Sequence, residues 1–389
     1  MPNLFNELQN RLPISNQSFT KIRQLGRIYV DKTSFVQALA ENDQPRILTR
    51  PRRFGKSTLL STIEELFLHG VEPYDGHDSY FKGLSIGKTW KDLGHYHVLH
   101  LDFHNLNSTC ATAEQFQRKL MRRIADFCGE HQLRVRKDPI DLEEQLDSVL
   151  AQLPDNSLVL LIDEYDSPLL YHAQDERELK ACTLLMRGLF STVKSNSGKF
   201  RCVFFTGITR FQDLDLGTAG NNFTDISMAP SFAACCGYTR EELKVCFYDH
   251  LRYSAAVRLG IKDEEVTEED IESLLDEMSS WYDGYSFDGK PGSHVFSTWS
   301  VLRFFADEEA RLTPYWSREE GLGLPRLLKL YLDRIDLQKL LMETAAGAFR
   351  INEEQFLESS LVNPEANPYS LLFQTGYLTL KEQIGRAHV

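Results

Sequence analysis

Three residues near the start of the chain, Gly55, Lys56 and Ser57, have the types and the order that bind phosphate. A short apolar run at 47–48 precedes them, and a helical pattern over 59–67 follows. Between a strand and a helix, such a loop directs backbone N–H groups at an anion, the lysine reaches the outer phosphates, and the serine hydroxyl ligates Mg²⁺. The pattern predicts a phosphate-binding loop for ATP and Mg²⁺.

One position departs from the usual phosphate-loop pattern. That pattern has a second glycine five residues before Gly55, where this chain has Arg50. Arg52 and Arg53 extend a basic stretch whose charge suits a phosphate site. The residues of this loop that we expect at the nucleotide are Arg53, Phe54, Gly55, Lys56, Ser57 and Thr58. Because of Arg50, the loop alone does not decide the function.

The segment before the loop strand, from Tyr29 to Thr33, has two interpretations. Asp31 or Thr33 can cap a helix that continues to Ala40, because short polar side chains accept the free N–H groups of a first helical turn. Alternatively, Tyr29 and Asp31 contact the nucleotide in a pocket for its base. Residue chemistry alone leaves both interpretations open.

Two adjacent acids follow the most hydrophobic run of the chain. Residues 158–162 are all Leu, Val or Ile, and Asp163 and Glu164 come directly after them. Such a run is typical of a strand buried on both faces of a parallel sheet, and ligands bind beyond the carboxyl ends of such strands. In phosphate-loop enzymes the first acid holds Mg²⁺ and the second can polarise the attacking water. Alone, the acids could merely cap a helix, but together with the loop they favour nucleotide binding.

Thr206 and Arg210 follow the next apolar run, at 202–205. A hydroxyl beside the acid-bearing strand could bond the γ-phosphate or the water, although threonine is also common at strand ends. Arg210 could stabilise transition-state charge, contact a neighbouring subunit or lie in water. We predict catalytic roles for both residues, together with Lys56 and Glu164.

Strand and helix patterns alternate through the first part of the chain. Strands are expected at 47–48, 98–103, 158–162 and 202–206, and helices at 59–67, 113–128, 141–152 and 177–194. This alternation predicts an α/β fold, a three-layer sandwich around a parallel sheet with right-handed crossovers. From about residue 238 helical patterns dominate, at 239–259, 267–281, 299–311 and 324–345. The C-terminal region is therefore expected to be mostly helical, with a winged helix as one form of it.

The composition restricts the class of protein. The chain has 389 residues and a formal net charge of −13, which argues against a nonspecific nucleic-acid binder. Its seven cysteines include no Cys-x-x-Cys pair, and Cys235 and Cys236 are adjacent, too close for an easy mutual disulfide. We expect reduced thiols in a cytoplasmic protein, since neither an export signal nor a window of membrane-spanning length occurs in the sequence.

Seven segments of the chain carry a resemblance to a known family. They are 29–33, 50–57, 161–166 and 205–210, followed by 281–287, 296–302 and 371–378. Together they resemble the predicted AAA-ATPase-like family of bacterial proteins. The resemblance implies a P-loop ATPase of the additional-strand kind, and an Arg-Pro-Arg-Arg start is normal for that family. Its Asn-Pro-Trp-Ser pattern appears here as Ser297 to Ser300, so a role of that Asn-Pro is not carried over.

The family often has a PD-(D/E)XK nuclease-like domain after the segment that corresponds to 371–378, whereas this chain ends at Val389. Its last six residues also match one reading frame of a common sequencing adapter. We expect a fragment with an AAA-like ATPase domain at 1–237, a helical or winged-helix-like region at 238–383 and a non-native tail at 384–389. A nucleic-acid partner would bind through the missing domain, and oligomerisation is compatible with the sequence but not defined by it.

The residues and the resemblance together predict a Mg²⁺-dependent ATPase. Lys56 would hold the β- and γ-phosphates, and Ser57 and Asp163 the Mg²⁺. Glu164 would activate water and Thr206 would contact the γ-phosphate. Two alternatives stay open: a nucleotide-dependent binding module with negligible turnover, and a small-molecule kinase, for which the sequence shows neither a phosphoacceptor pocket nor lid arginines.

Overall fold

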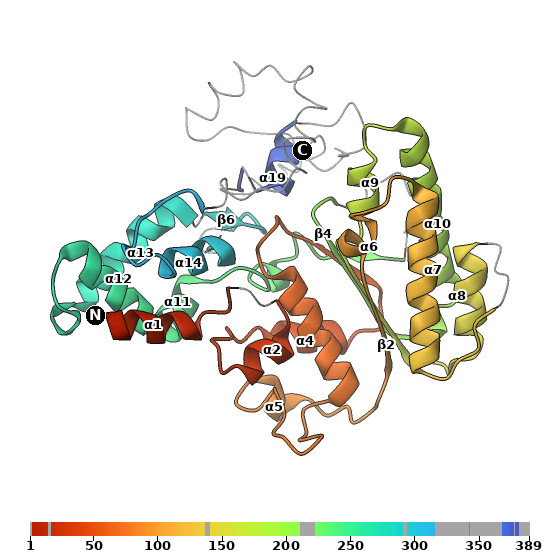
Figure 1. The fold of residues 1–389 in the computed structure, drawn as a ribbon, viewed down its shortest axis with the longest axis horizontal. Helices are drawn as coiled ribbons and strands as arrows, with labels where there is room; N and C mark the ends of the chain where they lie inside the picture. The colour runs from red at the N-terminus through yellow and green to blue at the C-terminus, as the bar shows by residue number, and fades with distance from the viewer. Residues whose placement is uncertain are drawn as a thin grey trace, which may run out of the picture.

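A computed structural model describes residues 2–14, 17–136, 141–210, 222–282, 284–290, 294–315, 342, 368–376 and 378–380. Over these residues the chain forms a parallel sheet covered by helices, followed by a mostly helical region (Figure 1). The fold class predicted from the sequence is confirmed. No described helix is both long and apolar enough to cross a lipid bilayer.

The main sheet has five parallel strands in the order β2-β3-β4-β1-β5. The strands are β1 (Arg46–Thr49), β2 (His97–Asp102), β3 (Leu158–Asp163), β4 (Phe200–Gly207) and β5 (Thr224–Asp225). Strand β4 lies between β1 and β3, with Thr206 opposite Leu48 in the register. Since parallel strands have their carboxyl ends at one edge, the segments that follow β1 and β3 meet there.

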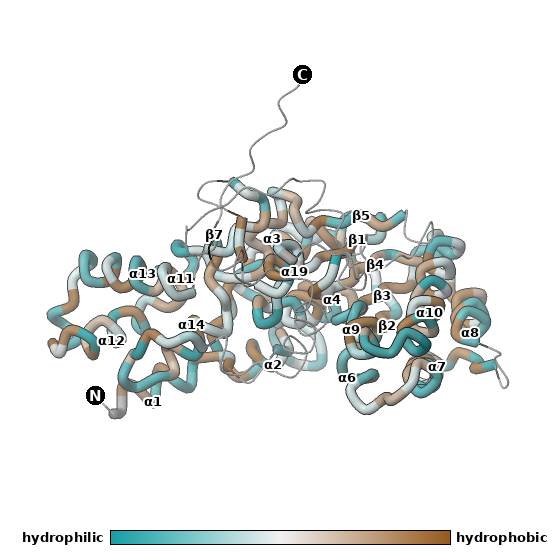
Figure 2. The backbone as a smooth tube through the Cα atoms, turned by 90° about the horizontal axis from the view of Figure 1, so that it is seen from above, coloured by the Kyte–Doolittle hydropathy of each residue, from teal (hydrophilic) through white to brown (hydrophobic). Residues whose placement is uncertain are grey.

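Helices cover both faces of the sheet, as the view from above shows (Figure 2). One face carries α2 (Phe19–Gln24), α3 (Thr33–Ala40), α4 (Lys56–His69) and α5 (Ile86–Thr89). The other carries α7 (Ala113–Glu130), α8 (Leu142–Leu150) and α10 (Glu176–Ser195), with the short α6 (Phe103–Asn107) and α9 (Ser167–Tyr171). Side chains of β3 alternate between the two cores, because Leu161 packs on the α4 side and Leu160 and Ile162 pack on the α10 side.

The helical region forms a third hydrophobic core. Its elements are α11 (Arg240–Cys246), α12 (Tyr248–Leu259), α13 (Glu268–Tyr282) and α14 (Thr298–Phe305), with the hairpin β6 (Tyr285–Ser286) and β7 (His294–Val295). Helix α1 (Pro2–Arg11) packs against α12, and Leu12 and Val30 share this core. The sequence had not predicted the hairpin, and a domain boundary near residue 237 stays a prediction.

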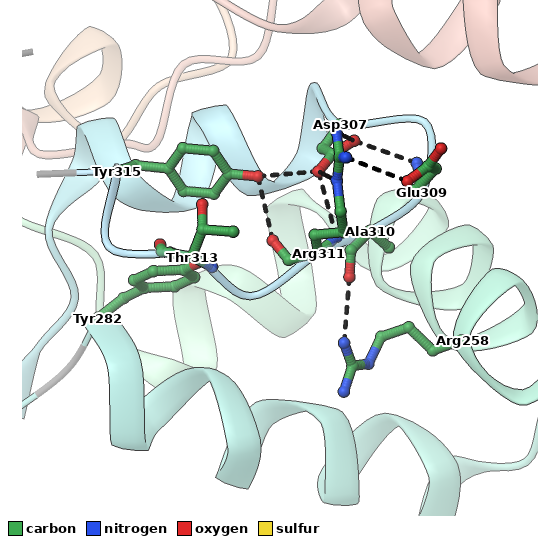
Figure 3. A network of polar contacts seen from close by, with 8 residues as sticks. All are labelled: Arg258, Tyr282, Asp307, Glu309, Ala310, Arg311, Thr313 and Tyr315. Atoms are coloured by element: carbon green, nitrogen blue, oxygen red, sulfur yellow. Dashed lines mark hydrogen bonds and ion pairs between the residues drawn. The ribbon is translucent and has the colours of Figure 1, made fainter. Parts of the chain in front are cut away.

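Polar contacts fix the segment after α14 against the helices (Figure 3). The hydroxyl of Tyr282 at the end of α13 donates to the carbonyl of Thr313 at 3.0 Å. Arg258 near the end of α12 donates to the carbonyl of Ala310 at 3.1 Å. Short 3-10 helices occur at Ser197–Lys199, Pro230–Phe232 and Asp263–Glu265, and α19 is Pro368–Gln374. The helix expected at 324–345, except Met342, and the tail at 384–389 lie outside the described residues.

Candidate nucleotide-binding site

The loop between β1 and α4 has the backbone shape that a phosphate loop needs. Gly55 is the N-cap of α4 with φ 93°, and Arg53 also has a positive φ of 68°. Glycine adopts such a conformation without the steric cost that a Cβ imposes. Helix α4 then begins at Lys56, so its free N–H groups face the carboxyl edge of the sheet.

Lys56 and Ser57 make the contacts that define the loop. The Lys56 ammonium is buried and donates to the carbonyls of Arg50 and Pro51, both at 3.0 Å. The Ser57 hydroxyl donates to Oδ2 of Asp163 at 2.5 Å. A residue at the end of β3 is therefore in direct contact with the start of α4, as the order of the sequence motifs predicts.

Asp163 is held from two sides and is 4% exposed. Its Oδ1 accepts the hydroxyl of Thr206 on β4 at 2.5 Å, while its Oδ2 accepts Ser57. Thr206 is fully buried and does not line the cavity beside the loop. The structure thus places the Thr206 hydroxyl behind Asp163, not at the open edge where a γ-phosphate sensor would lie.

Glu164 follows Asp163 and lines the same cavity. Its φ of 50° is unusual for a residue with a Cβ, and such backbone strain is frequent at functional sites. Burial raises the pKa of Glu164 above its ordinary value, although the positive charges of Lys56 and Arg52 oppose the shift. His104 Nδ1 lies 3.5 Å from Glu164 Oε2 and acts in the same direction as these charges.

The cavity encloses about 460 Å³ beside the loop. Its polar end is formed by the loop, by Asp163 and Glu164, and by residues after β2. Its other lining residues are mostly apolar: Pro13, Ile14, Ile22, Ile28, Tyr29, Val30, Tyr238, Trp299 and Leu302. A charged end and an apolar end in one cavity match a ligand that has a phosphate group and a flat ring.

Arg50, which replaces the usual first glycine, is a buried structural side chain with 1% exposure. Its guanidinium donates to the carbonyls of Ser227 at 2.6 Å and Phe232 at 2.9 Å. It also lies 4.0 Å from the centre of the Phe287 ring. Arg50 therefore joins the loop to the segment after β5 and does not face the cavity.

The other predicted site residues are distributed as follows. Tyr29, Arg53, Phe54 and Thr58 line the cavity. Asp31 does not: its Oδ1 accepts the N–H of Thr33, the first residue of α3, at 2.9 Å, and its Oδ2 accepts the N–H of Ser85. Arg210 is also outside the lining, with its Nε 3.6 Å from Asp225 Oδ2. The N-cap residue of α3 is Lys32, without a side-chain capping bond, so the prediction of Asp31 or Thr33 as the N-cap is wrong. The pocket interpretation fits Tyr29.

Sequence reasoning missed three cavity residues: Asp102, the last residue of β2, and His104 and Asn105 directly after that strand. It also missed that α14 contacts the loop. The hydroxyl of Thr298 donates to the carbonyl of Arg53 at 2.5 Å, and the guanidinium of Arg53 lies 5.0 Å from the ring centre of Trp299. The position of Asp102 at a strand end and the family-like segment at 296–302 were the available signals.

Asp166 connects the segment after β3 with the segment after β4. This buried carboxylate accepts the backbone N–H groups of Ile208 at 2.9 Å and Thr209 at 2.6 Å, directly after β4. A Cβ on Gly207 would lie 2.6 Å from the ring of Tyr165, which only glycine avoids. Asp166 therefore fixes the turn after the strand that carries Thr206.

The strand order, the Gly-Lys-Ser loop after β1 and the acids after β3 define the class of the protein as an α/β protein with a P-loop NTPase-like fold. The chain belongs to the family described as Predicted AAA-ATPase, whose model matches residues 13–217, more than half of its length. This confirms the resemblance noted in the sequence.

One relative is an Azotobacter chroococcum mcd 1 protein named "Uncharacterized protein in vnfD 5'region", which is 27% identical over 376 residues. The matched region covers 96% of this chain and 64% of the relative. The chain thus spans less than two thirds of that protein's length.

Proposed function

We propose that this chain binds ATP with Mg²⁺ and hydrolyses its terminal phosphoanhydride bond. One observation carries the proposal: the hydroxyl of Ser57 and the carboxylate of Asp163, far apart in the sequence, lie 2.5 Å apart beside the buried Lys56. The family description supports ATP as the nucleotide.

The donor set fits Mg²⁺. A serine hydroxyl and a carboxylate are hard oxygen ligands, and this cation keeps several water and phosphate ligands in addition to one or two protein ligands. Ser57 and Asp163 would hold the ion, whose charge would then offset that of the phosphates. Thr206 would keep Asp163 in place, so we assign it a positioning role instead of a phosphate contact.

Lys56 and Glu164 supply the remaining chemistry in this proposal. The Lys56 ammonium would leave the carbonyls of Arg50 and Pro51 for the β- and γ-phosphates, where its charge is more strongly stabilised. Ionised Glu164 at the cavity wall would orient and polarise the attacking water. Arg210 pairs with Asp225 and lies outside the cavity lining, so this proposal gives it no direct part in catalysis.

The apolar end of the cavity would hold the base. Tyr29, Tyr238 and Trp299 supply rings, and Ile14 and Ile28 supply aliphatic surface. Aromatic and aliphatic side chains stabilise a flat heterocycle by stacking and by excluding water. These residues come from the N-terminal segment and the helical region, so base binding would connect that region with the phosphate loop.

Phosphate release from the purified chain tests the proposal. We expect Mg²⁺-dependent release, no ATP binding by Lys56→Ala, and binding with at least about a hundredfold slower release by Glu164→Gln, because general-base catalysis contributes about that much. Glu264→Gln, an exposed glutamate, is the matched control. Equal turnover by Glu164→Gln and the parent chain would refute the assigned base. ATP binding without release by the parent chain would instead identify a nucleotide-dependent binding module.

A nucleic-acid partner is a separate proposal that rests on the resemblance noted in the sequence. The matched region covers 64% of the relative, and the resemblance noted in the sequence implies a nuclease-like domain in such proteins. We propose that ATP use serves that domain. The test is whether DNA changes phosphate release by the Azotobacter chroococcum relative but not by this chain, and an equal response of both would overturn it.

A further inference from the structure

Arg52 is a residue of the phosphate loop that has no part in the chemistry proposed above. It lines the cavity together with Lys56 and Glu164. Within the part of the chain that the structure describes, no residue forms a hydrogen bond or an ion pair with its guanidinium. A guanidinium has five N–H donors in a planar fork whose geometry matches phosphate oxygens. Arg52 therefore offers these donors to a ligand at the polar end of the cavity.

The backbone on both sides of Arg52 is held by hydrogen bonds to distant segments. Arg50 donates its N–H to the carbonyl of Gly207 at the end of β4, at 3.1 Å. The carbonyl of Arg53 accepts the N–H of Trp299 at the start of α14, at 3.3 Å. A side chain on a fixed backbone has less freedom to lose when it binds a ligand. The loop thus positions Arg52 in advance, while its guanidinium stays available.

The charge of Arg52 acts on Glu164, the proposed base. Burial raises the pKa of Glu164, and the positive charges of Lys56 and then Arg52 are the strongest influences that oppose this shift. Because the interaction of two charges weakens with distance, this effect places the guanidinium near the Glu164 carboxylate. In the proposed function the γ-phosphate lies between Lys56 and the water that Glu164 orients. The reacting phosphorus would therefore lie beside Arg52.

The other arginines near this edge of the sheet already have partners. The guanidinium of Arg50 donates to backbone carbonyls after β5. Arg210 has its Nε 3.6 Å from Asp225 Oδ2. The guanidinium of Arg53 lies 5.0 Å from the ring centre of Trp299. Each of these three would have to give up a contact before it could reach a phosphate.

We propose that Arg52 is a catalytic residue that donates to the γ-phosphoryl oxygens in the transition state of ATP hydrolysis, and that each chain supplies this arginine to its own site. The inference deepens the proposed function and rests on it. An arginine in this position stabilises the charge that the transferring phosphoryl group spreads over its three oxygens. No arginine of a neighbouring subunit is then needed for turnover.

The hydrolytic step balances with water as the co-reactant. The water oxygen bonds to the γ-phosphorus while the bond from that phosphorus to its bridging oxygen breaks. The electron pair of the broken bond stays on ADP. One water proton passes to Glu164, which returns it to solvent, and the other stays on the new phosphate. Arg52 keeps its protons and donates two N–H groups throughout the step.

Trapping with MgADP and aluminium fluoride, a planar mimic of the transferring phosphoryl group, tests the role of Arg52. We expect the parent chain to retain ADP in this complex through gel filtration and Arg52→Ala to lose it. Arg52→Ala should bind Mg·ATP within about threefold of the parent chain and release phosphate at least about a thousandfold more slowly, as expected for a contact made in the transition state. Retained ATP binding would also show that the variant is folded.

Two further variants sharpen this measurement. Arg52→Lys keeps the charge but not the planar fork, so it should recover only part of the rate. Arg118→Ala, whose side chain is 67% exposed on α7 and outside the cavity lining, should match the parent chain. Trapping and turnover by Arg52→Ala equal to those of the parent chain would overturn the proposal. Equal losses of ATP binding and turnover would make Arg52 a ground-state phosphate ligand and would also overturn it.

A mixture of two inactive variants tests whether the arginine comes from the same chain. Arg52→Ala retains Glu164, and Glu164→Gln retains Arg52. If each chain uses its own arginine, the mixture stays as inactive as its components, and the rate per parent chain is constant on dilution. Activity recovered in the mixture, or a rate per chain that falls on dilution, would show that a second chain supplies the arginine.

The parent chain distinguishes failure of this inference from failure of the proposed function. If the parent chain neither binds nor hydrolyses Mg·ATP, the proposed function and the role of Arg52 are both wrong. If the parent chain does both while Arg52→Ala is unimpaired, the proposed function stands and only the role of Arg52 is wrong.

Discussion

Arg50 departs from the usual phosphate-loop motif because its side chain has a structural role. The usual glycine lets a loop backbone approach phosphate, whereas this arginine leaves the cavity and donates to carbonyls after β5. Its charge is stabilised by these acceptors and by the face of Phe287. The loop then depends on Arg50 for its attachment to the sheet edge.

Restoring the glycine should therefore weaken the protein. Arg50→Gly leaves the carbonyls of Ser227 and Phe232 without this donor, and we expect a loss of about 2–4 kcal/mol in the free energy of unfolding. Urea denaturation measures this loss. Arg52→Gly, at a partly exposed position of the same loop, controls for the added backbone freedom. A loss no greater than that of the control would contradict the structural role of Arg50.

Glu164 leads to a prediction about pH. Its pKa is raised by burial, so it becomes protonated, and inactive as a base, at a pH above the ordinary glutamate range of about 4.3. His104→Gln removes a neighbour that lowers this pKa. We expect the acid limb of the kcat profile to move to higher pH in this variant. His95→Gln, an exposed histidine, should leave the limb in place, and an unmoved limb in His104→Gln would contradict the coupling.

Among the elements, α1 is attached to α12 through a histidine that must be neutral. His250 is 2% exposed, and its Nε2 donates to the carbonyl of Leu8 at 3.0 Å. Burial lowers the pKa of His250 to about 4, and nearby Arg11 acts in the same direction while Asp249 opposes it. Protonation of this side chain is therefore favoured when α1 and α12 separate.

The low pKa of His250 makes the stability of the folded chain depend on pH. In the unfolded chain the pKa of histidine is about 6.5, so that state binds more protons than the folded state between about pH 6.5 and 4. The contribution of neutral His250 to the free energy of unfolding is present above pH 6.5 and is lost as the pH falls. At pH 4 the loss is about 2–3 kcal/mol. Urea titrations of the parent chain and His250→Gln should differ in slope over this window. Identical slopes would show that His250 does not control the attachment.

Helix α14 connects the helical region with the loop. Its first residues, Thr298 and Trp299, donate to the carbonyl of Arg53, which has a positive φ. The loop conformation is thus determined partly by a helix more than two hundred residues later in the chain. Nucleotide that moves the loop would also act on α14.

For the whole molecule, the cavity lies where residues of the sheet domain, the N-terminal segment and the helical region meet. A ligand there contacts all three parts and should stabilise them together. At a hundred times its dissociation constant, Mg·ATP should add about 2.7 kcal/mol to the free energy of unfolding. We expect a single thermal transition that moves to higher temperature in the parent chain and stays in place in Lys56→Ala.

Two controls separate stabilisation by Mg·ATP in the cavity from other effects of the nucleotide. ATP without Mg²⁺ should stabilise the parent chain less, because Ser57 and Asp163 would lack the shared cation. Arg311→Ala, on the helical region away from the cavity, should keep the full shift. A shift of the same size in Lys56→Ala would place the stabilising nucleotide outside the proposed site.

The sequence by itself determined the strands and the order of the chemical motifs. Nearly every residue of the runs at 158–162 and 202–206 is hydrophobic. Such runs predict buried parallel strands whichever strands lie beside them. Gly55, Lys56 and Ser57 specify a phosphate loop because the chemistry resides in adjacent residues. The acids at 163–164 follow from their position at the end of such a run. These features depend on short segments of sequence, so they can be predicted without the tertiary structure.

Only the tertiary structure decided what the long-range partners do. Arg50 and Thr206 are chemically suited to phosphate, yet one is bonded to carbonyls after β5 and the other to Asp163. Asp31 accepts the N–H groups of Thr33 and Ser85, while Tyr29, two residues earlier, lines the cavity. A side chain's type fixes what it can bind, but its partner depends on which distant segment packs beside it, and that is set by the burial of three separate cores around one cavity.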